Sequence, residues 1–373
     1  MRVGLDATPL LGVRTGVGRY VEHLFEALAD DAAEHGDELV ATAFTLRGRG
    51  GLPTAVPGLV SIRARPAPAR VLHAAWARAE VPPVEWLTGR LDVFHATNFV
   101  LPPLRRAVGV VTVHDLSYLR TPDTVSPASL RYRTLVPRSI GRAAVVCTPS
   151  AAVAAEVREE YRLEPDRVVV TPLGVDASWF DTAAPPPSWL AGRELPGRYL
   201  LFVGTREPRK GLTTLLTGYA GLRSAAPDTP PLVLVGPPGW GPALDTAGLP
   251  SDAVHTIGYL PGDELRQLVA GAACLVFPSR YEGFGLPPLE AFACGTPVVA
   301  SDLAVTREVT GRHARLVPVG DADALADALT ATLADGGPTG AAERREHARG
   351  FTWTRCAETT RVAYRRALTT VGS

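Results

Sequence analysis

The stretch of sequence that decides the fold runs from residue 274 to residue 299 and reads Cys274-Leu-Val-Phe-Pro-Ser-Arg-Tyr-Glu282-Gly-Phe-Gly-Leu-Pro-Pro-Leu-Glu290-Ala-Phe-Ala-Cys-Gly-Thr-Pro-Val-Val. Its apolar start, without alternation of polar and apolar residues, predicts a strand buried on both faces of a sheet. Pro287 and Pro288 stand where the first turn of a helix tolerates missing amide hydrogens, and we expect Glu290 in that same turn. A buried strand that passes through a glycine-bearing loop into a helix is typical of a parallel α/β sheet.

The loop and the helix start together predict an anion-binding site. Backbone amides at a helix N-terminus, with the positive end of the helix dipole, suit a pyrophosphate group. The amides in question belong to Gly283, Phe284, Gly285 and Leu286. Glu282 and Glu290 flank them, and their carboxylates can accept hydrogen bonds from sugar hydroxyls. The plainer alternative is that Glu282 only favours a turn and Glu290 only the start of the helix.

Short apolar runs rich in Val and Leu recur along the whole chain, with helical stretches between them. In the first half they are residues 3–7, 39–46, 93–97, 108–114, 145–150 and 168–172. In the second half they are residues 199–204, 232–236, 254–260, 274–279, 298–301 and 314–319. None alternates with period two, so each is predicted to be a buried parallel strand with helical crossovers. The expected fold is α/β, with two Rossmann-like parallel sheets.

A proline-rich stretch separates the two halves of the chain. Residues 174–198 contain four prolines and follow neither the helical nor the strand period, which indicates a linker. We therefore expect an N-terminal domain over residues 1–173 and a C-terminal domain over residues 199–353. A charged final helix begins near residue 354, and we expect residues 354–373 to cross back onto the N-terminal domain.

The composition excludes several classes of protein. Among 373 residues, 38 basic residues balance 38 acidic ones, so no global field would hold a nucleic acid. The four cysteines are scattered, and neither they nor the histidines have the spacing of a metal site, so we expect no metal and a reducing, cytoplasmic location. Asp321-Ala-Asp323 is predicted to cap a helix.

With no signal peptide and no uncharged run of 18 residues, we expect a soluble protein, at most peripheral at the inner face of a membrane.

One basic segment is compatible with a membrane surface or an acidic acceptor. Four arginines share a predicted helix with apolar residues, in an amphipathic pattern. They are Arg131, Arg133, Arg138 and Arg142. The plainer interpretation is an ordinary packed helix.

The chain contains a single lysine, Lys210. It lies in Phe202-Val-Gly-Thr-Arg-Glu-Pro-Arg-Lys210-Gly-Leu, where a predicted strand ends and a basic loop opens a helix. A lysine retained in so arginine-rich a chain indicates a site that needs a compact ammonium rather than a planar guanidinium. The alternative is a solvated helix terminus.

Together these segments resemble the retaining glycosyltransferases of family 4, and above all the bacterial mannosyltransferases within it. The pair Glu282 and Glu290, with Glu-Gly-Phe-Gly-Leu-Pro between them, resembles the family's paired-glutamate signature. Its other landmarks follow in chain order: Thr15-Gly-Val-Gly-Arg-Tyr20, Phe94-His-Ala-Thr-Asn98, His114-Asp-Leu116, Thr148-Pro-Ser150 and Leu173-Gly-Val-Asp176. The resemblance covers residues 2–320 and implies the GT-B fold, in which two Rossmann-like domains have parallel sheets that face a central cleft.

The resemblance also implies roles on the donor side. Lys210 would neutralise the departing diphosphate together with an arginine. Because Thr205 stands where many members have that arginine, Arg206 or Arg209 must supply the charge, and Arg206 is slightly favoured. Glu282 would bind the hydroxyls of the sugar and Glu290 those of the ribose.

Further residues in the N-terminal half gain roles in the same way. Gly16 and Gly18 would let the backbone of an N-terminal glycine loop approach the diphosphate. His114 would lie against the transferred sugar, supported by Asp115. His95 ends a similar strand and could approach the acceptor.

The implied activity is transfer of a hexose from a nucleotide diphosphate sugar to a hydroxyl group, with retained configuration and without a metal or other cofactor. GDP-mannose is the leading donor by resemblance, and the acceptor would be a glycan, a lipid-linked molecule or a secondary metabolite. The alternatives are a GT-B sugar-nucleotide epimerase and a silent nucleotide-sugar or glycan-binding module. The donor base, the acceptor and the oligomeric state stay open at this point.

Overall fold

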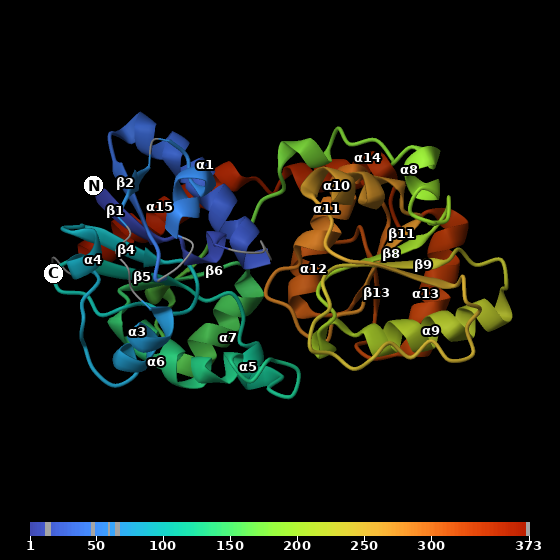
Figure 1. The fold of residues 1–373 in the computed structure, drawn as a ribbon, viewed down its shortest axis with the longest axis horizontal. Helices are drawn as coiled ribbons and strands as arrows, with labels where there is room; N and C mark the ends of the chain where they lie inside the picture. The colour runs from blue at the N-terminus through green and yellow to red at the C-terminus, as the bar shows by residue number, and fades with distance from the viewer. Residues whose placement is uncertain (12–15, 46–48, 59, 64–67, 371–373) are drawn as a thin grey trace. The chain divides into compact units, whose positions relative to one another are not determined.

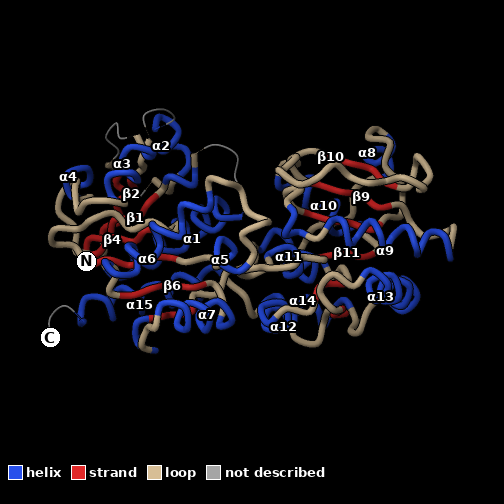
Figure 2. The backbone as a smooth tube through the Cα atoms, turned by 90° about the horizontal axis from the view of Figure 1, so that it is seen from below, coloured by secondary structure: helices blue, strands red, loops and turns tan. Residues whose placement is uncertain are grey.

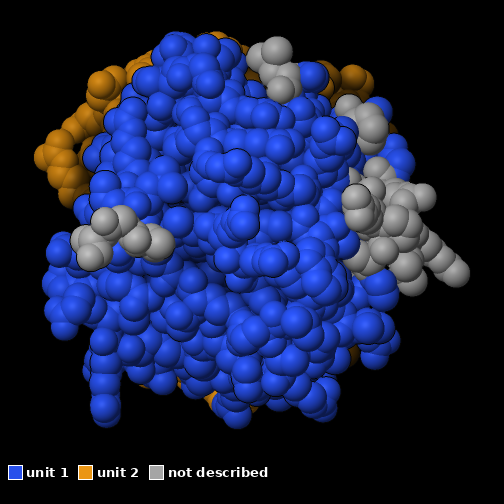
Figure 3. Space-filling view, turned by 90° about the vertical axis from the view of Figure 1, so that its left-hand side faces the viewer, with its two compact units in different colours: residues 1–119, 127–174, 352–373 blue, residues 120–126, 175–351 orange. Residues whose placement is uncertain are grey.

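The computed structural model describes residues 1–11, 16–45, 49–58, 60–63 and 68–370. It divides into two compact units, shown together in Figure 1, and Figure 3 shows one face of unit 1. Unit 1 comprises residues 1–119, 127–174 and 352–373, and unit 2 comprises residues 120–126 and 175–351. Most of the segment 174–198, expected as a linker, therefore belongs to unit 2, where it forms η5 (Ala177–Trp179) and α8 (Pro187–Ala191).

Unit 1 is built on a seven-stranded sheet in the order β3-β2-β1-β4-β5-β6-β7, with every pairing parallel. The strands are β1 (Arg2–Asp6), β2 (Glu38–Thr42), β3 (Ser61–Ile62), β4 (Val93–Ala96), β5 (Val108–Thr112), β6 (Val145–Thr148) and β7 (Val168–Val170). All six apolar runs of the first half form strands, as predicted. The short edge strand β3 was not predicted, because two residues carry no periodicity.

Helices cover both faces of this sheet (Figure 2). They are α1 (Gly16–His35), α2 (Leu52–Ala55), α3 (Ala69–Trp76), α4 (Glu85–Thr88), α5 (Ser117–Arg120), α6 (Tyr132–Arg142), α7 (Ala151–Tyr161) and α15 (Trp353–Thr370). Because side chains alternate along a strand, one set of strand residues packs with α3, α6 and α7 in a single core cluster. The other set meets α15, which packs against α1 and contacts β4, β5, β6 and β7.

Unit 2 has a six-stranded parallel sheet in the order β10-β9-β8-β11-β12-β13. The strands are β8 (Leu200–Val203), β9 (Leu232–Val235), β10 (Val254–Ile257), β11 (Cys274–Phe277), β12 (Val298–Ser301) and β13 (Arg315–Val317). Each apolar run of the second half forms one of them, so the predicted parallel sheets are confirmed.

The helices of unit 2 are α9 (Leu212–Ala225), α10 (Gly262–Gly271), α11 (Leu286–Cys294), α12 (Ala304–Thr310), α13 (Ala322–Asp335) and α14 (Ala341–Arg349). Asp321 accepts a hydrogen bond from the amide of Ala324 and caps α13, which confirms the predicted cap. The polar helix α14 was not predicted. It is anchored by the buried Arg344, whose Nε and Nη2 donate to the carbonyl of Gly295 at 3.0 and 2.8 Å.

A buried polar network ties α1 and α15 to the sheet of unit 1. The Nδ1 atom of His95 lies 2.8 Å from the hydroxyl of Tyr364, and Nε2 lies 2.7 Å from Oγ1 of Thr112. The hydroxyl of Tyr20 lies 3.1 Å from the same Thr112 oxygen. Burial lowers the pKa of His95 to about 3, with a smaller contribution from His114, so the ring stays neutral. Neutral imidazole has one donor and one acceptor, and the two hydroxyl groups satisfy both.

This network should make unit 1 sensitive to acid. Because the pKa of His95 in the folded chain lies below its ordinary value of 6.5, its stabilising effect is complete above pH 6.5 and is lost as the pH falls toward about 3. Between pH 6.5 and about pH 5 this one group should lower the free energy of unfolding by roughly 2 kcal/mol. We expect His95→Gln, which cannot titrate, to lose less stability over that interval in urea unfolding.

The matched control is His35→Gln, since His35 is exposed on α1. Parallel pH dependences for wild type and His95→Gln would contradict the assignment of a buried neutral imidazole.

Candidate functional site

The loop between β8 and α9 carries the single lysine. After β8 the chain passes Gly204 and forms η6 (Pro208–Lys210), and Gly211 follows with φ of +70°. A Cβ atom at Gly211 would lie 1.9 Å from the carbonyl oxygen of Pro278. Only glycine can therefore bring this loop so close to the end of β11.

The loop after β11 meets it. The amide of Arg280 donates to the carbonyl of Arg209 at 2.7 Å, which joins the two loops. Gly285, with φ of +95°, caps α11, whose first turn contains both prolines as predicted. The prediction for Glu290 is wrong by one turn: because α11 already begins at Leu286, Glu290 lies in its second turn, where it is 2% exposed.

The carboxylate of Glu282 is the centre of a charged cluster formed by these loops. The Nζ atom of Lys210 lies 2.6 Å from its Oε1 and the Nη1 atom of Arg209 lies 3.2 Å from its Oε2. The hydroxyl of Ser279 donates to Oε1 at 2.7 Å. The Nε atom of Arg209 is also paired with Glu207 at 3.1 Å. Two cations and two carboxylates thus lie together at the carboxyl ends of β8 and β11.

Electrostatics keeps Glu282 ionised in this cluster. Burial alone would raise the pKa of its carboxyl group, since only 7% of the side chain is exposed. The charges of Lys210 and Arg209 and the hydrogen bonds from Lys210 and Ser279 outweigh burial, and the pKa is lowered. Because a buried carboxylate needs its cations, the charged state of Glu282 depends on Lys210 and Arg209.

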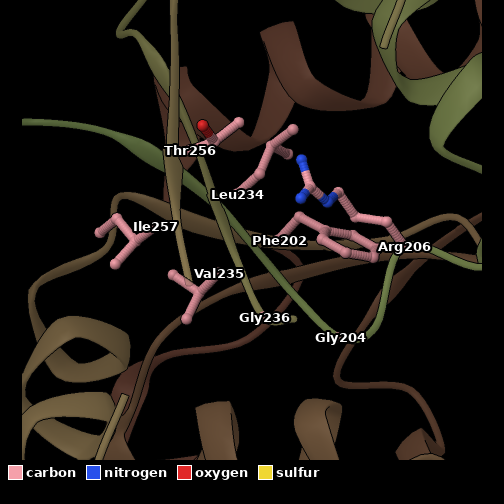
Figure 4. A pocket seen from close by; sticks show the side chains of 8 residues that line it. All are labelled: Phe202, Gly204, Arg206, Leu234, Val235, Gly236, Thr256 and Ile257. Carbon is pink, nitrogen blue, oxygen red and sulfur yellow. The ribbon is translucent and has the colours of Figure 1, made fainter. Parts of the chain in front are cut away.

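Of the two arginines left open by the sequence, Arg209 is the one that lies beside Lys210. Arg206 instead lines a small pocket at the carboxyl ends of β8, β9 and β10, where its side chain lies next to Phe202 (Figure 4). Gly204, Gly236 and Thr256 line the same pocket.

The predicted anion-binding loop is a buried part of unit 2. Its four residues, Gly283, Phe284, Gly285 and Leu286, are all buried, and they follow Glu282 directly. The ring of Phe284 packs edge-on against Phe351, with centroids 6.1 Å apart. The loop therefore has a defined backbone conformation beside the charged cluster.

In unit 1, His114 lies just beyond the end of β5, two residues past Thr112. Its Nε2 atom lies 2.8 Å from the carbonyl oxygen of Thr97. The rings of Tyr20 and Phe99 pack edge-on against it, with centroids 5.1 and 5.5 Å away. Burial lowers the pKa of His114, although the bond to Thr97 and the charge of Asp115 act in the opposite direction.

Two expectations for unit 1 need correction. Gly16 and Gly18 lie in the first turn of α1 rather than in a loop, and the first residue of their motif, Thr15, lies outside the described residues. His95 cannot approach an acceptor, because it is fully buried and both of its ring nitrogens are within hydrogen-bond distance of buried hydroxyl groups.

Sequence reasoning missed two residues at the same edge of the unit 1 sheet. Asp6 ends β1, and burial raises the pKa of its carboxyl group to about 6, although the hydrogen bonds from Thr8 act to lower it. The sequence could have indicated Asp6, because an acidic residue stands directly at the end of an apolar strand. Phe99 adopts a φ of +61°, which is costly for an aromatic residue, and holds its ring against His114. Nothing in the local sequence indicates that conformation.

The described residues offer neither a cluster of metal ligands nor a membrane-spanning helix. No group of three or more histidine, cysteine, aspartate or glutamate side chains that could hold a metal ion occurs among them. Within the same part of the chain, no helix has the length and apolar character needed to span a bilayer.

Family models and relatives support the family that the sequence motifs resemble. A family model described as Glycosyltransferase Family 4 matches residues 14–179, and one described as Glycosyl transferases group 1 matches residues 197–335. The chain is 32% identical over 283 residues to the O-antigen chain mannosyltransferase B of Escherichia coli. That alignment covers 73% of this chain and 74% of the relative.

Solved structures share the whole fold. Sucrose-phosphate synthase from Thermosynechococcus elongatus superposes with a TM-score of 0.76 at 22% identity, over 100% of both chains. HepE from Anabaena, determined in complex with UDP-glucose, superposes with a TM-score of 0.61 at 19% identity, over 100% of this chain and 97% of that one. The two parallel sheets with their helices are those of the GT-B fold. On the strength of its motifs, its fold and its mannosyltransferase relative, the chain belongs to glycosyltransferase family 4.

Proposed function

We propose that this glycosyltransferase moves a hexose from a nucleotide diphosphate sugar to a hydroxyl group with retained anomeric configuration. The observation that carries the proposal is the cluster of Lys210, Arg209 and Glu282 at the carboxyl ends of β8 and β11. In open parallel α/β sheets, ligands bind outside the carboxyl ends of the strands. The acceptor is proposed to be a glycan, a lipid-linked molecule or a secondary metabolite.

The cluster has the charges that this reaction needs. When the bond from the sugar to the diphosphate breaks, negative charge develops on the leaving phosphate, and fixed cations stabilise it. Lys210 and Arg209 would supply those cations, and the amides from Gly283 to Leu286 would add hydrogen-bond donors. The carboxylate of Glu282 would then be free to accept bonds from sugar hydroxyls.

The remaining groups are proposed to bind and orient the substrates. Glu290 would accept hydrogen bonds from the ribose. In unit 1, His114 would contact the sugar as a neutral ring, in keeping with its lowered pKa. With no other base assigned, the leaving phosphate would take the proton of the acceptor hydroxyl. Because Lys210 and Arg209 would supply the positive charge, the reaction is proposed to need neither a metal ion nor another cofactor.

The donor is proposed to be GDP-mannose. Support comes from the relative that is named a mannosyltransferase. The main alternative donor is UDP-glucose, with which HepE was determined. A thermal-shift comparison of GDP, UDP, dTDP and ADP decides between them. We expect GDP to raise the unfolding temperature most, because a ligand stabilises the folded chain according to its affinity.

Product analysis by mass completes this donor test. A glycosylated acceptor is expected from GDP-mannose. An isomerised sugar nucleotide with no transfer product would instead identify an epimerase, and the absence of any turnover would identify a binding module.

The second prediction concerns metal ions. Because Lys210 and Arg209 already supply positive charge for the diphosphate, sugar transfer should continue in excess EDTA. Activity that disappears with the chelator and returns specifically on adding Mg²⁺ or Mn²⁺ would show that a cation is required.

The third prediction concerns Lys210. Lys210→Ala should lower turnover at saturating donor by about 10²- to 10³-fold, by analogy with the loss of one donor to a developing oxyanion. Lys210→Arg keeps the charge but replaces a compact ammonium with a planar fork, so we expect a substantial remaining defect. Initial rates with purified variants measure both effects.

Arg312→Ala is the matched control for these variants, since the side chain of Arg312 is 77% exposed and pairs with Glu343 at the surface of unit 2. It should turn over like wild type. If both Lys210 variants also do so, the assignment of the diphosphate site to this cluster is refuted.

A further inference from the structure

Residues 69–142 carry a local excess of positive charge in a chain that is neutral as a whole. Residues 69–142 contain ten arginines and five acidic residues, whereas the whole chain has 38 basic and 38 acidic residues. The rest of the chain is therefore net acidic.

The structure gathers much of this segment on one side of unit 1. The guanidinium of Arg142 on α6 donates to the carbonyl of Trp76 on α3 at 2.9 Å and is paired with Glu80 at 2.7 Å. Helix α4 is joined to the loop between β4 and β5, because Glu85 accepts hydrogen bonds from the amides of residues 105–107. These contacts join residues 69–88, which hold α3 and α4, to the loop 101–107 and to residues 129–142, which hold η3 (Ser129–Arg131) and α6. We call the exposed side of these three segments the basic face; Figure 1 shows the course of their backbone.

The acidic groups of the basic face already have partners. The hydrogen bond from Arg142 is the main cause of a lowered pKa for Glu80. Burial acts to raise the pKa of Glu85, but its backbone hydrogen bonds outweigh burial and the pKa is lowered. Both carboxylates are therefore ionised and paired with groups of the face itself. The exposed arginines of the face are Arg70, Arg78, Arg105, Arg106, Arg131, Arg133 and Arg138.

Large apolar side chains lie exposed among these arginines. Trp86 is 57% exposed, Val71 62%, Val81 53% and Leu130 37%. They are four of the eight large apolar side chains that are exposed in the described part of the chain. An ordinary packed helix, the plainer alternative, accounts for the buried side of α6, but these four side chains lie outside α6, on α3, α4, η3 and the segment between α3 and α4.

The combination points to one kind of partner. Arginines attract phosphate groups of any polyanion, but tryptophan and valine gain nothing from a soluble, fully hydrated one. At a bilayer surface both kinds of residue are satisfied, because tryptophan favours the headgroup region and basic residues bind anionic lipids. We propose that the basic face docks unit 1 on an anionic lipid bilayer, with Trp86, Val71 and Val81 among the headgroups and the arginines on lipid phosphates.

This docking is separate from the proposed donor chemistry. The basic face consists of unit 1 residues only, whereas the cluster of Lys210, Arg209 and Glu282 belongs to unit 2. Binding to lipid should therefore occur without any sugar nucleotide. Failure of the lipid test and failure of the transferase assay can be told apart.

The test is co-sedimentation of the full chain with phospholipid vesicles. We expect binding to vesicles rich in phosphatidylglycerol, little binding to vesicles of phosphatidylcholine alone, and weaker binding as salt rises. The double variant Arg105→Glu/Arg106→Glu should bind at least about tenfold more weakly, because each basic residue near an anionic surface contributes to the affinity. Trp86→Ser should weaken binding severalfold, at unchanged charge.

The matched control is Arg355→Glu/Arg365→Glu, which reverses the same number of charges at exposed positions of α15, a helix outside the basic face. It should bind like wild type, and thermal unfolding of each variant verifies that unit 1 is folded. Wild-type binding that does not depend on anionic lipid, or basic-face variants that bind like the control, would overturn the proposal. Binding to soluble heparin without binding to vesicles would also overturn it and assign the face to an acidic polymer.

Discussion

The ion pair between Lys210 and Glu282 is the interaction on which the candidate site depends. A carboxylate that is 7% exposed is stable as an anion only beside cations, and removing one partner of such a pair typically costs about 3–5 kcal/mol. The pair also has a steric requirement, since Gly211 must lack a Cβ atom for its loop to reach Pro278. One glycine, one lysine and one glutamate therefore join the ends of β8 and β11, and the conformation of both loops follows from them.

The two cations of this cluster are held differently, and this bears on the proposed chemistry. The guanidinium of Arg209 is fixed by Glu207, by the carbonyl of Tyr281 and by Glu282. The ammonium of Lys210 is held at 2.6 Å by Glu282 and is a compact group on a flexible stem. A diphosphate that enters the site would compete with Glu282 for Lys210 while Arg209 stays in place. The same carboxylate would thus hold the lysine before the donor binds and be released for the sugar afterwards.

In unit 1, burial keeps two histidine side chains neutral. Its two central histidines, His95 and His114, both have lowered pKa values, and desolvation is the main cause in each. Both ring nitrogens of His95 are paired with hydroxyl groups, and the ring ties α15 to the sheet. His114 is a 9% exposed residue at the carboxyl edge of the sheet, and its ring packs against Phe99. Two histidines at the ends of neighbouring strands therefore serve packing in one case and an edge position suited to a substrate in the other.

The amino-acid sequence by itself determined the parallel α/β sheets, because apolar runs without alternation indicate strands that are buried on both faces. It also determined the cap of α13 at Asp321 and the first turn of α11 at Pro287, because capping and the missing amide hydrogen of proline are local properties. It also singled out Lys210, Glu282 and His114 for attention. Only the tertiary structure decided that Arg209 rather than Arg206 lies beside Lys210, because both belong to one loop and the choice depends on Glu282, 73 residues away. Only the tertiary structure also shows that His95 cannot reach an acceptor, since one of its ring nitrogens is paired with the hydroxyl of Tyr364, 269 residues along the chain. Strand and helix patterns are local, whereas the exposure and partners of a polar side chain are set by segments that the fold brings from elsewhere.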